Sequence, residues 1–138
     1  MTIKFPVNEK VISAQSVFTI LKDILKAEDV LDQEKEHFWS IGLNAQNQIK
    51  YIDLVHLGTI NQCPCAPMEV YRRACITGVV NLVVAHNHPS GNCSPSHEDY
   101  TATKRMKDAG KILGIKLLDH IIVGDESYYS FADDGSLI

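Results

Sequence analysis

The sequence lacks the features of a membrane or secreted protein. No apolar run approaches the length of a bilayer span, and the chain does not open with a basic segment followed by an apolar stretch. Internal repeats, low-complexity tracts and linkers are also lacking. We therefore expect one cytoplasmic domain over residues 1–138, in which residues 1–12, with few periodic signals, form an N-terminal arm.

An excess of basic residues is lacking too. The chain has 17 acidic and 13 basic residues, which gives a net charge of −4 at pH 7 with histidine neutral. Proteins that contact nucleic-acid phosphates need clustered lysine and arginine, so the charge balance argues against a nucleic-acid partner. With 45% hydrophobic and 22% charged residues, the composition is typical of a globular domain that buries its own core.

The four cysteines lack the paired C-x-x-C spacing of common structural zinc sites. Cys63 and Cys65 flank a proline and, with Cys75 and Cys93, offer an alternative zinc set, although Cys75 falls in a predicted helix. A reducing compartment gives disulfides no role, so we expect free thiols. The H-x-E and P-C-x-x-C motifs of zinc nucleoside deaminases are absent.

The most informative stretch is a short apolar run at residues 79–85 that ends in two histidines. Such a run predicts a strand that is buried on both faces. His86 and His88 are two residues apart, so in an extended chain their imidazoles project to the same side and can bind one ion. Asn87 then points away from them.

A turn and a helix start follow this strand. Pro89 and Gly91 end the strand and favour a tight turn, which lets the chain double back. Ser96 and Asp99 have the S-x-x-D form of a helix N-terminus. A helix that begins there returns a carboxylate from its first turn toward the histidines.

Two imidazoles and one carboxylate make a zinc ligand set. We predict that His86, His88 and Asp99 bind Zn²⁺, which leaves a fourth position for water, as in catalytic zinc sites. His97 is an alternative third ligand, which we rank below Asp99 because it directly follows the expected helix cap. A helix-capping role alone would also account for Ser96 and Asp99.

Residues 86–99, HNHPSGNCSPSHED, resemble the H-x-H-P and S-x-x-D signature of the JAB/MPN (JAMM) metalloprotease superfamily. The HNHPSG wording, LDHIIVG at 118–124 and YSF at 129–131 are similar to its RadC branch, the so-called DNA repair proteins. The resemblance runs from about Glu36 to the C-terminus. It implies a JAB/MPN (cytidine-deaminase-like) fold, zinc as the cofactor and a peptide or protein substrate, with nucleic acid as a further partner.

The resemblance also implies two catalytic side chains. Glu36 resembles the catalytic glutamate of the family, a base that activates metal-bound water. Ser96 matches the family serine that stabilises the oxyanion. From the residues alone, Glu36 could equally be a solvated strand-end glutamate. His120 is interpreted as a packed strand residue, or one that contacts a ligand, and not as a ligand itself.

Periodicity and helix-end signals predict the other elements. Ser13 caps an amphipathic helix, and a turn at 44–47 joins strands 36–43 and 48–57. A helix runs from Pro67 to Gly78, another covers 96–113, and strands cover 115–124 and 127–132. The order predicts an α/β fold with a mixed β-sheet sandwiched by helices. The buried face of the helix after Pro67 is expected to hold Val70, Tyr71, Ala74 and Cys75.

Three classes of function are consistent with these patterns. They are a zinc-dependent hydrolase of peptide or isopeptide bonds, a DNA-repair-associated RadC-like factor, and a non-catalytic metal-binding scaffold. The combination of ligands, base and serine favours the hydrolase. The stretch before Glu36 predicts only one helix, whereas many RadC proteins have a helix-hairpin-helix region there, and this difference weakens the link to DNA.

Overall fold

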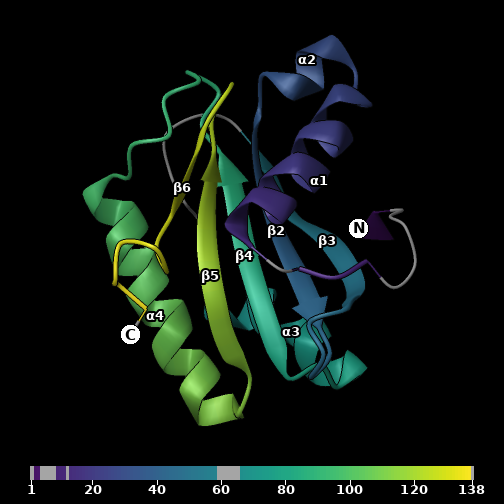
Figure 1. The fold of residues 1–138 in the computed structure, drawn as a ribbon, viewed down its shortest axis with the longest axis vertical. Coiled ribbons are helices and arrows are strands. Elements are labelled where there is room, and N and C mark those ends of the chain that lie inside the picture. Colours follow the sequence, from purple (N-terminus) through teal and green to yellow (C-terminus); the bar gives the residue numbers. More distant parts are fainter. Residues whose placement is uncertain (1, 4–8, 12, 59–65, 138) are drawn as a thin grey trace.

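The computed structural model describes residues 2–3, 9–11, 13–58 and 66–137 (Figure 1). None of the helices in this part of the chain is both long and apolar enough to span a membrane. The elements are β1 (Thr2–Ile3), α1 (Ala14–Lys26), α2 (Val30–Gln33), β2 (Glu36–Leu43), β3 (Ile49–Gly58), α3 (Pro67–Thr77), β4 (Asn81–Asn87), α4 (His97–Leu113), β5 (Lys116–Val123) and β6 (Tyr128–Ser130).

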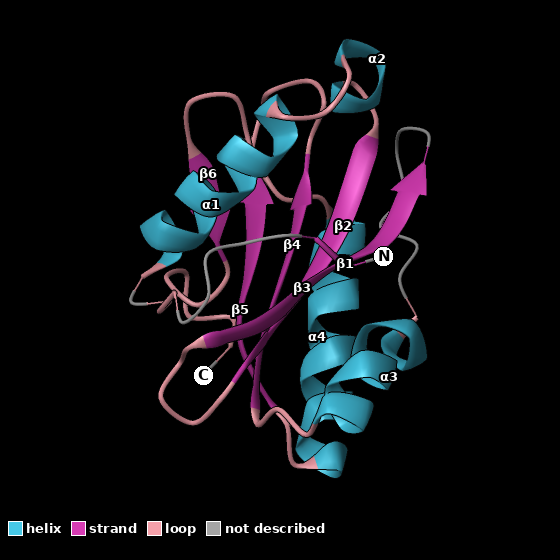
Figure 2. Ribbon diagram, turned by 90° about the vertical axis from the view of Figure 1, so that its right-hand side faces the viewer, coloured by secondary structure: helices cyan, strands magenta, loops and turns pink. Residues whose placement is uncertain are grey.

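The strands of the described residues form one mixed sheet in the order β1-β3-β2-β4-β5-β6. β2 is antiparallel to both β3 and β4, whereas β4 runs parallel to β5. β1 and β6 are antiparallel edge strands beside β3 and β5. Figure 2 shows α1 on one side of the sheet and α3 and α4 on the other. The predicted α/β fold, a mixed sheet sandwiched by helices, is confirmed.

Helix α1 covers one face of the sheet. It begins at the predicted cap, Ser13, whose side chain accepts a hydrogen bond from the Ser16 N–H. Its apolar stripe buries Val17, Leu21 and Leu25 against the face that carries alternate residues of β2. Full burial of each such side chain contributes roughly 1.5–3 kcal/mol. The packing of α1 on this face therefore stabilises the positions of β2 and β4.

Helices α3 and α4 cover the opposite face. Pro67 opens α3 and Gly78 ends it, as predicted. Its buried residues are Val70, Tyr71 and Ala74. Cys75 is exposed, so its placement on the buried face was wrong. Around the helix axis, Ala74 lies between Val70 and Tyr71, whereas Cys75 lies beyond Tyr71 and so outside the buried stripe.

Strand β4 lies between the two layers and is buried on both faces, as predicted. Val83 and Ala85 pack with α1, whereas Leu82 and Val84 pack with α3 and α4. Because side chains alternate along a strand, His86 projects to the α3 and α4 side. The end of β4 thus lies next to the start of α4.

Gly42 of β2 has no space for a side chain. It pairs with Tyr51 of β3, and a Cβ at this position would clash with the Tyr51 ring. The ring cannot move aside easily, because it is 1% exposed and the Arg73 guanidinium lies 4.9 Å above its centroid.

We expect Gly42→Ala to lower the free energy of unfolding by about 1–3 kcal/mol, measured by urea denaturation, because it overpacks the core. In a Tyr51→Val background, which removes the ring, the same substitution should cost clearly less. An equal cost in both backgrounds would contradict this account of the glycine.

Candidate metal centre

The end of β4 and the start of α4 bring three candidate ligands together. His86 Nε2 lies 3.1 Å from His88 Nε2 and 3.2 Å from Asp99 Oδ1, and His88 Nε2 lies 3.5 Å from Asp99 Oδ2. One ligand atom from each residue falls within 4.8 Å of the others. A single ion can therefore contact all three side chains.

A turn and a helix cap produce this convergence. The Gly91 N–H donates to the His88 carbonyl oxygen at 2.8 Å, and Gly91 has a φ of 84°, which favours glycine. Ser96 Oγ accepts from the Asp99 N–H at 3.2 Å, while Asp99 Oδ2 accepts from the Ser96 N–H at 2.8 Å. This capping box fixes the carboxylate and leaves Oδ1 facing His86.

The proton of His88 is held away from the cluster. Its Nδ1 lies 2.8 Å from the Asn92 carbonyl oxygen, which can only accept. Nδ1 therefore carries the proton, and in the neutral ring the Nε2 lone pair points at Asp99 and His86. Imidazole lone pairs and a carboxylate are ligands that bind transition-metal cations such as Zn²⁺, so the cluster suits a cation of this kind.

The electrostatics of the site favour a positive charge. The hydrogen bond to Asp99 raises the pKa of His88 above its ordinary value, although burial lowers it. Burial raises the pKa of Asp99, but the hydrogen bonds that His86 and His88 donate through Nε2 when they are protonated outweigh this effect and hold the pKa of the carboxyl well below its usual range. Asp99 is therefore ionised in spite of its burial.

Glu36 lies beside this cluster. The register of β2 against β4 pairs Phe38 with His86, so Glu36, two residues earlier on the same face, comes level with His88. Glu36 is 7% exposed, and its charge adds to the rise in the pKa of His88. The side chain is thus a buried carboxylate next to the candidate ligands and not a solvated strand end.

Asn87 holds the backbone on both sides of Glu36. Its Oδ1 accepts from the His37 N–H at 2.6 Å, and its Nδ2 donates to the Lys35 carbonyl oxygen at 3.1 Å. The sequence pattern predicts only that this side chain points away from the histidines. The contact joins residues about 50 positions apart, so no local signal reveals it.

His120 is buried among the site residues. Its Nε2 lies 2.8 Å from His86 Nδ1, on the side of that ring that faces away from Asp99. Burial and the neighbouring His86 lower the pKa of His120 well below its ordinary value, so this ring is neutral. It therefore contacts a candidate ligand, as one of the two sequence interpretations allows.

The other sequence candidates lie outside the cluster. Among the described residues, the metal-compatible group holds only the two histidines and Asp99, and His97 is exposed at the first position of α4. Cys75 and Cys93 are free thiols. Cys63 and Cys65 lie outside the described residues, so the structure does not bear on the alternative cysteine set.

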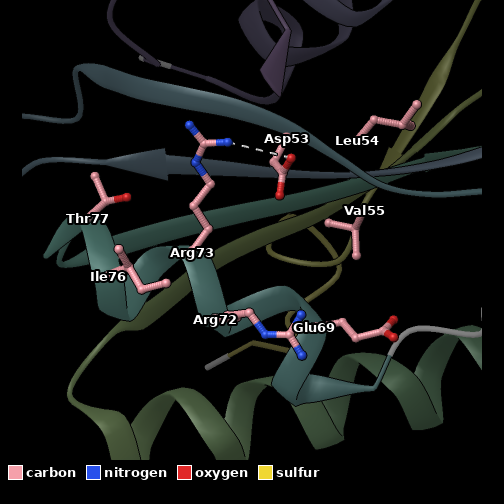
Figure 3. A pocket seen from close by; sticks show the side chains of 8 residues that line it. All are labelled: Asp53, Leu54, Val55, Glu69, Arg72, Arg73, Ile76 and Thr77. Carbon is pink, nitrogen blue, oxygen red and sulfur yellow. Dashed lines mark ion pairs between the residues drawn. The ribbon is translucent and has the colours of Figure 1, made fainter. Parts of the chain in front are cut away.

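Two cavities differ in their relation to the site. His88, whose side chain is 21% exposed, lines a cavity of about 110 Å³ between α1 and the end of β4. A second cavity of about 580 Å³ lies between β3 and α3 (Figure 3). Its walls carry charges of both signs, including Asp53 paired with Arg73 at 3.8 Å, but none of the candidate ligands.

The sheet order and the residues at the end of β4 define an α/β domain of the JAB/MPN type. The model of the RadC-like JAB domain matches residues 11–136, and the chain belongs to this family. Its place in the family supports a JAMM-related or RadC-associated role.

Similar proteins come from bacteria and archaea. A UPF0758 protein of Desulforamulus reducens is 40% identical over 111 residues, which cover 80% of this chain and 49% of the relative. One from Methanosarcina mazei is 37% identical over 126 residues, covering 91% and 53%. One from Geobacillus kaustophilus is 41% identical over 108 residues, covering 78% and 48%. The chain thus spans about half the length of these relatives.

Protons should compete with zinc at this cluster, because a histidine must be neutral to bind a metal. The pKa of His88 lies above its ordinary value of about 6.5, so a fall in pH protonates His88 before an unperturbed histidine. We expect the apparent zinc affinity to fall from pH 8 to pH 6, by up to about tenfold per pH unit for each displaced proton, in chelator competition.

The exposed His97 provides the matched control. His97→Ala should bind zinc with the wild-type affinity at every pH. An affinity that is equal at pH 6 and pH 8, or a profile that flattens in His97→Ala, would contradict the assignment of the competing proton.

Proposed function

We propose that this domain is a zinc-dependent hydrolase of peptide or isopeptide bonds, with His86, His88 and Asp99 as the metal ligands. The observation that carries the proposal is the convergence of two imidazole Nε2 atoms and a buried, ionised carboxylate, with Glu36 buried beside them. Membership of the RadC-like JAB family supports a JAMM-related activity.

The donor set suits zinc. Two imidazoles and one carboxylate are a ligand combination of catalytic zinc sites, which keep a fourth position open for water or substrate. When bound, zinc supplies a Lewis acid that polarises a carbonyl group and makes water a better nucleophile near neutral pH. The partly exposed edge of His88 gives the site access to solvent.

The remaining chemistry comes from two side chains. Glu36 accepts a proton from the attacking water on a carboxylate oxygen and passes it to the leaving amine. Asn87 supports this role by holding the backbone on either side of Glu36. Ser96 Oγ accepts from the Asp99 N–H, so its own hydroxyl proton can be donated to the developing oxyanion.

The alternatives have weaker support. A DNA-repair-associated role rests on the name of the RadC family, and the net charge of −4 gives it no electrostatic basis. A metal-binding scaffold would use the same ligands but would have no need of a buried Glu36 beside them.

The direct test separates the base from the ligands. In a peptide-library cleavage assay, we expect Glu36→Gln to lower the hydrolysis rate by about 10² to 10⁴, because the amide keeps the size of the side chain and cannot accept the proton. Zinc should stay bound at one ion per chain. Glu34→Gln, the same change at an exposed position two residues away, should keep the wild-type rate.

Two further measurements decide between the classes of function. His88→Ala should lose stoichiometric zinc, and a chelator should abolish cleavage by the wild-type protein. A wild-type protein that binds zinc and cleaves no member of the library would support the scaffold and contradict the proposal. Zinc loss in Glu36→Gln would make Glu36 a ligand and contradict its role as the base.

A further inference from the structure

We propose that Thr103 and His120 are positioning residues that hold the proton of His86 on Nδ1 and thereby direct the His86 Nε2 lone pair at the candidate metal position. This inference deepens the proposed function and rests on the same ligand set. Thr103 lies in α4 and His120 in β5, and neither belongs to the H-x-H or S-x-x-D motif.

A continuous chain of hydrogen bonds links the two ligand elements. Thr103 Oγ1 lies 2.7 Å from the Asp99 carbonyl oxygen and 2.5 Å from His120 Nδ1. His120 Nε2 lies 2.8 Å from His86 Nδ1. Thr103 is 2% exposed, and both histidines are fully buried, so water does not compete for these bonds.

The direction of each bond follows from its partners. A carbonyl oxygen only accepts, so the Thr103 hydroxyl uses its single proton to donate a hydrogen bond to the Asp99 carbonyl oxygen. The hydroxyl oxygen must therefore accept from the Nδ1–H of His120. A neutral imidazole carries one proton, so His120 Nε2 accepts and the Nδ1–H of His86 donates. In the neutral ring, His86 Nε2 is thus left without a proton, 3.2 Å from Asp99 Oδ1.

The fold fixes the geometry of this series of hydrogen bonds. Thr103 lies one helical turn after Asp99, so both side chains face the sheet from α4. β5 runs parallel to β4 beside it, which brings His120 next to His86. Phe131 stacks on the His120 ring at a centroid distance of 4.8 Å and restricts its rotation. Asp99 therefore has two roles. Its side chain is a candidate ligand, and its carbonyl oxygen accepts the first hydrogen bond of the series.

The consequence concerns metal affinity. An imidazole whose remote N–H has a fixed acceptor is held in the tautomer and orientation that metal binding needs, and loss of such a partner typically lowers affinity 10- to 100-fold. Without His120 as an acceptor, His86 could place its proton on Nε2, where it would block the metal position.

Thr103→Val removes the hydroxyl with little change of shape, and Thr103→Ser retains it. We expect Thr103→Val to lower the zinc affinity about 10- to 100-fold in chelator competition, and Thr103→Ser to keep the wild-type affinity. Long-range ¹⁵N–¹H NMR of the metal-free proteins should show His86 protonated on Nδ1 in the wild type and in Thr103→Ser, and a mixture of tautomers in Thr103→Val.

The tautomer measurement separates positioning from general stability. A Thr103→Val protein that loses stability or affinity while His86 keeps its Nδ1 proton would overturn the inference. So would a metal-free wild type in which the neutral His86 ring is protonated on Nε2. If the wild type binds no zinc, the proposed function fails, but the metal-free spectra still decide whether Thr103 and His120 fix the His86 tautomer.

Discussion

The hydrogen-bond register between β2 and β4 sets the position of each part of the candidate site that lies on the sheet. It pairs Phe38 with His86, brings Glu36 level with His88 and lets Asn87 reach the backbone around Glu36. A slip of one residue would turn Glu36 to the α1 face and separate it from the histidines. The two apolar layers prevent that slip, because each strand buries side chains on both faces.

The second constraint is the free energy of burying polar groups. An ionised carboxylate inside a protein costs several kcal/mol unless other groups compensate it. Asp99 has such compensation from the cap at Ser96 and from the positive end of the α4 dipole, and from the two imidazoles when they are protonated. The same arrangement that stabilises the carboxylate also holds it in place to bind a cation. Folding and metal binding are therefore coupled through α4.

Local signals in the sequence predicted much of the fold and of the candidate ligand set. Ser13, Pro67 and Gly78 are helix-end residues with local mechanisms, so the start of α1 and both ends of α3 followed from them. The candidate ligand set could be predicted because it needs only a strand, a turn and a helix cap. In an extended strand the spacing of His86 and His88 places both imidazoles on one side, and the cap follows from the S-x-x-D helix start. β1 and α2 were not predicted, since such short elements carry no periodicity.

The supporting contacts could not be predicted because they join residues that are distant in the chain. Asn87 contacts the backbone at positions 35 and 37, and Thr103 contacts His120. Asn87 and Thr103 are buried polar residues, and a periodic pattern assigns such a residue a face but no partner. Cys75 was wrongly predicted to be buried for a different reason. The sequence of a short helix does not reveal where its buried stripe ends.

X-ray absorption spectroscopy of the zinc-loaded protein tests the central claim most directly, since it reports the atoms around the metal. The account predicts two imidazole nitrogens at about 2.0–2.1 Å and oxygens, from Asp99 and water, at about 2.0–2.2 Å. A sulfur neighbour at about 2.3 Å would assign the metal to cysteines instead. Either that result or a shell with a third imidazole would contradict the ligand set of His86, His88 and Asp99.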